Sequence, residues 1–91
     1  MHIKNLELKN TEWKALSELV GEELSSGTTY YINNNRSVPF WYIETSDAPD
    51  EEVEGSLNKA RQLIYKVASS TLYVRMSPDH VTTIDVDQVE E

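Results

Sequence analysis

The sequence predicts a mainly β domain, a small antiparallel β-sandwich or barrel with one short N-terminal helix. Several short segments are rich in β-branched and aromatic residues, and turn signals separate them at spacings of about ten residues. One stretch, near the N-terminus, has helical periodicity without a competing strand pattern. The 91 residues fit one domain and contain no cysteine. Disulfides therefore cannot stabilise the small core, and oligomerisation is the expected alternative.

The first twenty residues contain the helical signal. Residues 1–10 are expected to be an arm or a first strand. A short helix is predicted over residues 11–20, where Thr11 can cap the start and Gly21 can end it. Four apolar residues share one stripe of this helix: Trp13, Leu16, Leu19 and Val20.

Residues 28–86 are expected to form the sandwich. An asparagine-rich turn over 33–37 separates the first two strands, and we predict that these two form a hairpin. Residues 57–62 fit either a helix or a strand, so their structure stays open. The acidic end, residues 87–91, is expected to be frayed. Strands are predicted over 28–33, 38–45, 62–68, 71–76 and 81–86.

The charge is strongly negative, with sixteen acidic and eight basic residues giving a formal charge of −8. The basic residues are scattered along the sequence, which disfavours direct nucleic-acid binding. No apolar run has the length of a membrane span, and the N-terminal residues lack the apolar core of a signal peptide. We therefore expect no membrane contact and folding in a cytoplasm.

Catalytic and metal-binding patterns were not found. The acidic loop over 46–56 lacks the register of calcium ligands, which favours a solvated surface loop. His2 and His80 are too few for a zinc site, and His80 beside Asp79 lacks the nucleophile of a triad. The isolated glycines form no phosphate-binding loop. The prediction is a protein without catalytic residues, cofactor or metal.

Aromatic residues are the most informative feature. Because strand side chains alternate between faces, neighbouring aromatics must point to opposite sides. Tyr31, Trp41, Tyr73 and Arg75 are expected to face outward as a protein interface, since Tyr, Trp and Arg are enriched in interface hot spots. A second layer, such as the helix with Trp13, could instead cover this face. The predicted core consists of Tyr30, Ile32, Val38, Phe40, Tyr42, Leu72, Val74, Ile84 and Val86.

Three segments carry a family resemblance: Gly27-Thr28-Thr29-Tyr30-Tyr31-Ile32-Asn33-Asn34, Leu72-Tyr73-Val74-Arg75-Met76-Ser77 and Thr83-Ile84-Asp85-Val86. Their order resembles that of small β-sandwich virion accessory proteins of tailed bacteriophages, of the capsid decoration or tail-knob type. Many of these carry a G-T-x-Y-x-I-x-N strand and an L-Y-V-R-S strand. This chain departs from the pattern at Met76, and segment 57–66 lacks the expected glycine turn.

The resemblance implies a non-enzymatic structural protein of a bacteriophage particle. It would bind other virion proteins, capsid or tail components, and act as a homo-oligomer, with a trimer favoured. It would fold in the host cytoplasm and reside in the virion. Two other hypotheses stay open: a carbohydrate-binding module in which Trp41 and Tyr31 stack on sugar rings, and an acidic inhibitor in which the Asp47–Glu54 loop mimics nucleic acid.

Overall fold

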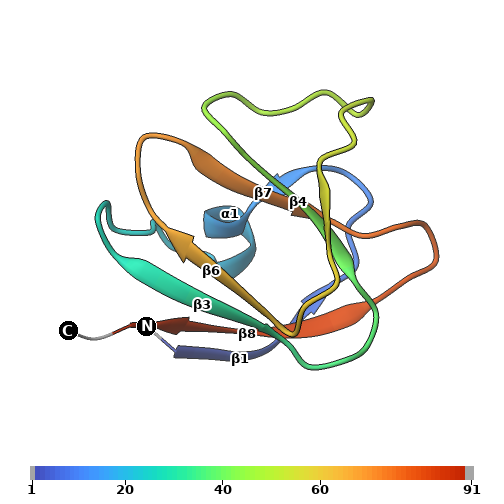
Figure 1. Cartoon of the computed structure of the whole chain (residues 1–91), viewed down its shortest axis with the longest axis horizontal. Coiled ribbons are helices and arrows are strands. Elements are labelled where there is room, and N and C mark those ends of the chain that lie inside the picture. The colour runs from blue at the N-terminus through green and yellow to red at the C-terminus, as the bar shows by residue number, and fades with distance from the viewer. Residues whose placement is uncertain (1, 90–91) are drawn as a thin grey trace.

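Two four-stranded antiparallel sheets pack against each other in the computed structural model, which describes residues 2–89 (Figure 1). The elements are β1 (His2–Leu8), β2 (Lys14–Ala15), α1 (Leu16–Val20), β3 (Thr29–Asn34), β4 (Phe40–Thr45), β5 (Ser56–Asn58), β6 (Gln62–Lys66), β7 (Thr71–Arg75) and β8 (Thr82–Gln88). The first sheet has the strand order β1-β8-β3-β6, and the second sheet has the order β2-β7-β4-β5. The predicted mainly β class with one short helix is confirmed.

The core lies between the two sheets and follows the period of two. Seven of the nine predicted core residues are buried, and the other two, Val38 and Tyr42, pack against the core from its periphery. Five further apolar residues are buried that were not among the predicted core: Leu8, Leu16, Tyr65, Val67 and Met76.

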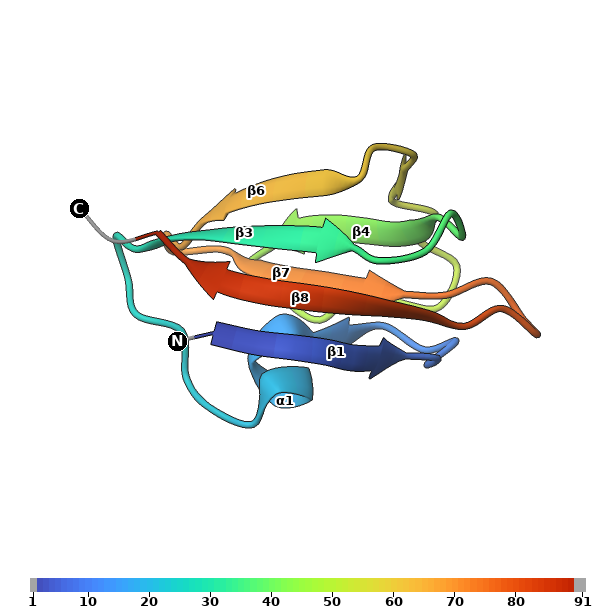
Figure 2. The same cartoon turned by 90° about the horizontal axis from the view of Figure 1, so that it is seen from below.

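The helix is shorter than predicted. It covers only Leu16–Val20, because residues 14–15 form β2 and pair with β7. Ala15 takes the N-cap position without a side-chain hydrogen bond, so Thr11 does not cap the helix. Gly21 ends it as expected, in the left-handed conformation with its N–H donating to the Ser17 carbonyl. The helix contacts both β1 and β7 and so covers the opening between the sheets (Figure 2).

The predicted hairpin between the first two sandwich strands is wrong. β3 pairs with β6 and β8, whereas β4 pairs with β5 and β7, so the two strands belong to different sheets. The connection between them passes from one sheet to the other, and within it the Asn34 side chain donates to the Val38 carbonyl at 2.8 Å. Pro39, which has no N–H to give to a ladder, precedes β4. Within segment 57–62, which the sequence leaves open between helix and strand, β5 ends at Asn58 and β6 begins at Gln62, so both ends of the segment are strand.

The C-terminal residues up to 89 are ordered in the sheet, contrary to the expected fraying from residue 87. Asp87 pairs with Tyr31 of β3, and the Val89 N–H donates to the Thr29 carbonyl at 2.9 Å. Residues 90 and 91, also part of the predicted acidic tail, lie outside the described residues. Strand order explains the difference, because β8 lies between β1 and β3 and its backbone is paired on both sides.

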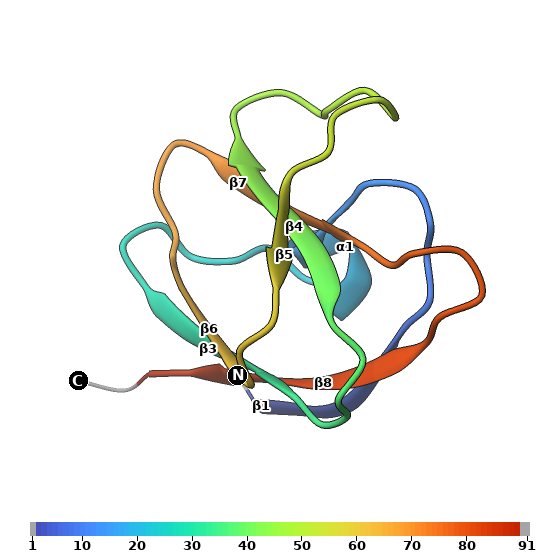
Figure 3. The same cartoon turned by 45° about the vertical axis from the view of Figure 1, so that its right-hand side comes forward.

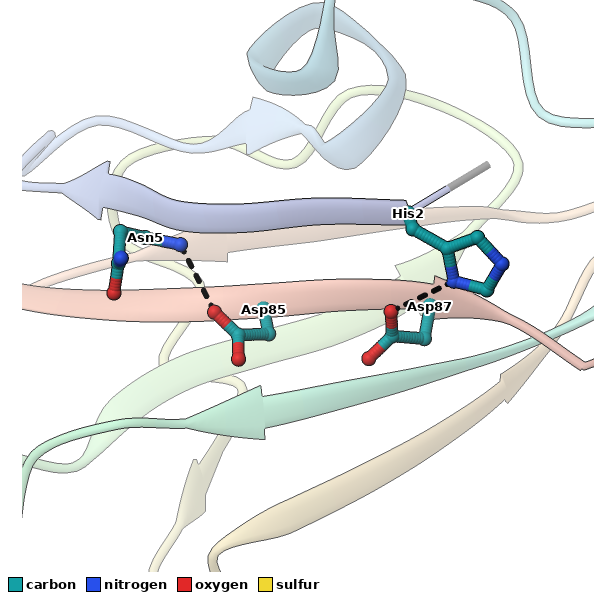
Figure 4. Close-up of polar contacts among 4 residues, drawn as sticks. All are labelled: His2, Asn5, Asp85 and Asp87. Atoms are coloured by element: carbon teal, nitrogen blue, oxygen red, sulfur yellow. Dashed lines mark hydrogen bonds and ion pairs between the residues drawn. The ribbon is translucent and has the colours of Figure 1, made fainter.

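Of the two alternatives for the N-terminal residues, an arm or a first strand, the structure has the strand: His2–Leu8 form β1. Two side chains of β8 hold this edge strand (Figure 4). Asp85 accepts the Asn5 backbone N–H at 2.9 Å, and Asp87 contacts His2 Nδ1 at 2.9 Å. Asn35 also donates to Asp85, and together these hydrogen bonds hold the pKa of Asp85 below its usual value.

Candidate functional site

Three of the four predicted interface residues lie together on the outer face of the second sheet. Trp41 of β4 is the direct cross-strand partner of Arg75 of β7, and Tyr73 lies two residues along β7 from Arg75. Tyr31 lies on β3, in the first sheet, where it pairs with Ile64 and Asp87. The four residues therefore do not form one surface. The alternation within each strand was read correctly, but alternation does not say which sheet a strand joins.

Arg75 is engaged within the chain. Its guanidinium lies 4.3 Å from the centroid of the Trp13 ring. It donates from Nη1 to the Glu51 carbonyl at 2.9 Å and from Nη2 to the Val53 carbonyl at 2.8 Å. The Trp13 indole N–H also donates to the Val53 carbonyl, at 3.1 Å. We call this group, Trp13 and Arg75 with the carbonyls of Glu51 and Val53, the loop clamp, because it holds the acidic β4–β5 loop (Figure 3).

Gly55 lets the loop return close to the sheet. Its φ is +71°, and a Cβ placed on it would lie 2.7 Å from Trp13 Cη2 and 2.8 Å from the Tyr42 carbonyl oxygen. Both the conformation and the close contact require glycine at this position. Intramolecular cover, the alternative to an interface, is therefore present at Arg75. The cover comes from Trp13 and the acidic loop, since Trp13 precedes β2 and is not part of the helix.

Trp41 borders a shallow groove of about 310 Å³ beside the loop clamp. The indole N–H of Trp41 donates to the Ser77 hydroxyl at 3.0 Å. Polar side chains from separate segments, those of Thr11, Glu54 and Arg75, line the same groove. An aromatic ring with convergent polar groups is the arrangement that sugar recognition needs, and the sequence did not show it.

The outer face of the first sheet presents an exposed apolar pair. Tyr31 and Ile64 are register partners on β3 and β6, with 37% and 61% of their surface exposed. β6 is an edge strand of this sheet. Ile64 was not predicted as a site residue because its segment was ambiguous. Strand alternation could have predicted that Ile64 faces outward, because its neighbours Leu63 and Tyr65 both point toward the core.

Basic residues that are scattered along the sequence meet in space. Arg36, Lys59 and Arg61 line one pocket, formed by the β3–β4 turn and the β5–β6 turn. No local pattern in the sequence predicts this pocket, because Arg36 in one turn and Lys59 in the other are more than twenty residues apart.

Comparison with protein-family models, curated proteins and solved structures found no match to the chain. Within residues 2–89, no three or more His, Asp or Glu side chains are grouped so that they could hold a metal ion. None of the described helical segments is long and apolar enough to cross a membrane.

Proposed function

We propose that this chain is a non-enzymatic accessory structural protein of a tailed-bacteriophage particle, which docks on another virion protein and works as a homo-oligomer. The observation that carries the proposal is the exposed Tyr31–Ile64 pair beside the open edge of the first sheet. The strand motifs that resemble virion accessory proteins support the phage context. The loop clamp shifts the expected docking surface away from Arg75, which it holds within the chain.

The Tyr31–Ile64 pair has the composition of an interface centre. A large aromatic ring and an aliphatic side chain lie side by side on a sheet, and polar residues border them: Asp87 on β8, with Gln62 and Lys66 on β6. Apolar centres with polar rims are typical of protein interfaces. β6 has no strand on its other side within the described residues, so its main chain is also available to a partner.

Substitution of both Tyr31 and Ile64 tests the proposed docking surface. Tyr31→Ala with Ile64→Lys should weaken attachment to the particle by about 2 kcal/mol or more, because the partner loses its apolar contact and meets a charge. The unfolding free energy of the isolated chain should change little, since both side chains point outward. Cosedimentation with particles that lack the protein measures attachment. Val81→Lys, a change of another exposed apolar residue, serves as the matched control. Attachment that survives the double substitution would contradict the proposed surface.

A carbohydrate-binding function is the second candidate, and the groove beside Trp41 is the observation in its favour. Stacking of a sugar ring on Trp41 predicts glycan binding that Trp41→Phe reduces and Trp41→Ala abolishes. A glycan array with wild type and both variants measures this. Tyr31→Ala is the control, because Tyr31 lies on the other sheet. No binding of the wild type to host-surface glycans would remove this candidate.

A further inference from the structure

The pocket between the β3–β4 and β5–β6 turns contains an unpaired buried donor. The pocket has a volume of about 520 Å³, and Asn58 is one of its lining residues. Only 6% of the Asn58 surface is exposed, and its Nδ2 has no hydrogen-bond partner among residues 2–89. A buried amide group without a partner costs about 1–3 kcal/mol. Such a group in a pocket wall indicates a ligand that brings an acceptor.

Three cations line the same pocket. Arg36, Lys59 and Arg61 line the pocket with exposed side chains, and within residues 2–89 none of them forms an ion pair. The chain has a net charge of −8, so these three unpaired positive charges make the pocket a local region of positive electrostatic potential. An acceptor ligand among guanidinium and ammonium groups is an anion, because charge-assisted hydrogen bonds to carboxylate or phosphate oxygens are the strongest that these groups make.

The turns that carry the cations are tied together. The Asn34 backbone N–H donates to the Arg61 carbonyl at 2.7 Å, which joins the two turns. The Asn34 side-chain oxygen accepts the Arg36 backbone N–H at 3.1 Å. The pocket therefore has a fixed frame before any ligand binds, and a fixed frame reduces the entropy cost of binding.

Acidic side chains that form no ion pair within residues 2–89 lie at the other end of the same strands. β4 runs from the pocket, at Pro39, to the β4–β5 loop, and β5 returns to the pocket at Asn58, so the two features lie at opposite ends of the hairpin (Figure 1). The loop clamp fixes the loop backbone and leaves the carboxylates exposed. No ion pair is found for these five within the described part of the chain: Asp47, Asp50, Glu51, Glu52 and Glu54.

We infer that the pocket receives the acidic β4–β5 loop of a second copy of this chain, in a head-to-tail contact. The inference rests on the proposed function only for the homo-oligomeric state. The loop offers a few carboxylates on a short protrusion, which suits a pocket of this size. A nucleic acid would continue beyond the pocket over a surface of net negative charge. A head-to-tail contact uses two different surfaces and closes into a ring when the rotation between copies allows it.

Charge reversal in the full-length chain tests the contact. Sedimentation velocity at tens of micromolar should show association of the wild type that weakens about tenfold or more between about 50 and 500 mM salt. Arg61→Glu should weaken it by a similar factor at low salt, as should Asp50→Lys with Glu52→Lys. A mixture of the pocket variant and the loop variant should associate again, because every junction between unlike copies then joins opposite charges.

Lys14→Glu is the control for the pocket variant and Glu22→Lys for the loop variant, since both are exposed charges elsewhere. Asn58→Asp, which replaces the donor by a negative charge, should also abolish association, and thermal melts show whether this buried variant folds. A strictly monomeric wild type, or association unchanged by Arg61→Glu, would overturn the inference. So would binding of inorganic phosphate to the pocket of a chain that stays monomeric. These outcomes are separate from particle attachment through Tyr31 and Ile64.

Discussion

Replacing Arg75 by alanine is expected to lower the unfolding free energy by about 3 kcal/mol, by releasing the β4–β5 loop. The variant loses two charge-assisted hydrogen bonds to carbonyls, worth about 1 kcal/mol each after allowance for partial exposure, and a cation–π contact of about 1 kcal/mol. Urea denaturation measures the free energy, and hydrogen exchange of the amides from 50 to 55 reports the loop. Arg75→Lys should recover only part of the loss, because an ammonium group lacks the planar fork that reaches both carbonyls.

The same substitution distinguishes two roles of Arg75: a member of the loop clamp and an anchor of a protein interface. If Arg75 were exposed for a partner, as the sequence predicted, the isolated chain would keep its stability within about 0.5 kcal/mol, the range of ordinary surface substitutions. Trp13→Ala should behave like Arg75→Ala, since it removes the ring under the guanidinium and the second donor to Val53. Two stable variants would show that the loop needs no clamp.

The elements of this fold were predictable from local pattern, but the pairing was not. Alternation of apolar residues located most of the strands and most of the core, because a half-buried strand has a strict period of two. The β3–β4 hairpin was wrong because partners are chosen by packing over the whole chain. Tyr30 pairs with Tyr65 and Gln88, both far away in sequence. The polar residues Asp87 and Gln88 look like a tail, yet they are strand because β3 fixes their backbone.

The candidate sites show the same division between local and non-local information. Period two correctly placed Trp41, Tyr73 and Arg75 on one face. It could not show that backbone carbonyls would bind Arg75, because every residue has a carbonyl and the residue types do not indicate which ones accept a hydrogen bond. The convergence of Arg36 and Arg61 could not be predicted either, since it depends on the pairing of β3 with β6, which brings the two turns together.

Asn34 is the residue whose loss should disturb both stability and the basic pocket. Its side chain is 8% exposed and makes three hydrogen bonds: to the Val38 carbonyl, from the Arg36 N–H and from the Thr82 hydroxyl at 2.6 Å. Thr82 is fully buried, so alanine at position 34 leaves its hydroxyl without this acceptor. We expect a loss of about 3 kcal/mol, of which the orphaned hydroxyl supplies about 1–2.

A double-mutant cycle isolates that part of the loss. Thr82→Val in the Asn34→Ala background should restore about 1 kcal/mol, because it removes the orphaned hydroxyl, while the same change in the wild type should destabilise. Asn34→Asp keeps acceptor oxygens for Arg36 and Thr82, but it places a carboxylate oxygen against the Val38 carbonyl in a buried site, so it should cost at least as much as Asn34→Ala. Asn34→Ala should also lose head-to-tail association at temperatures where the chain remains folded, since Arg36 is no longer held at the pocket. A folded Asn34→Ala chain that associates like the wild type would show that this turn does not set the position of the cations.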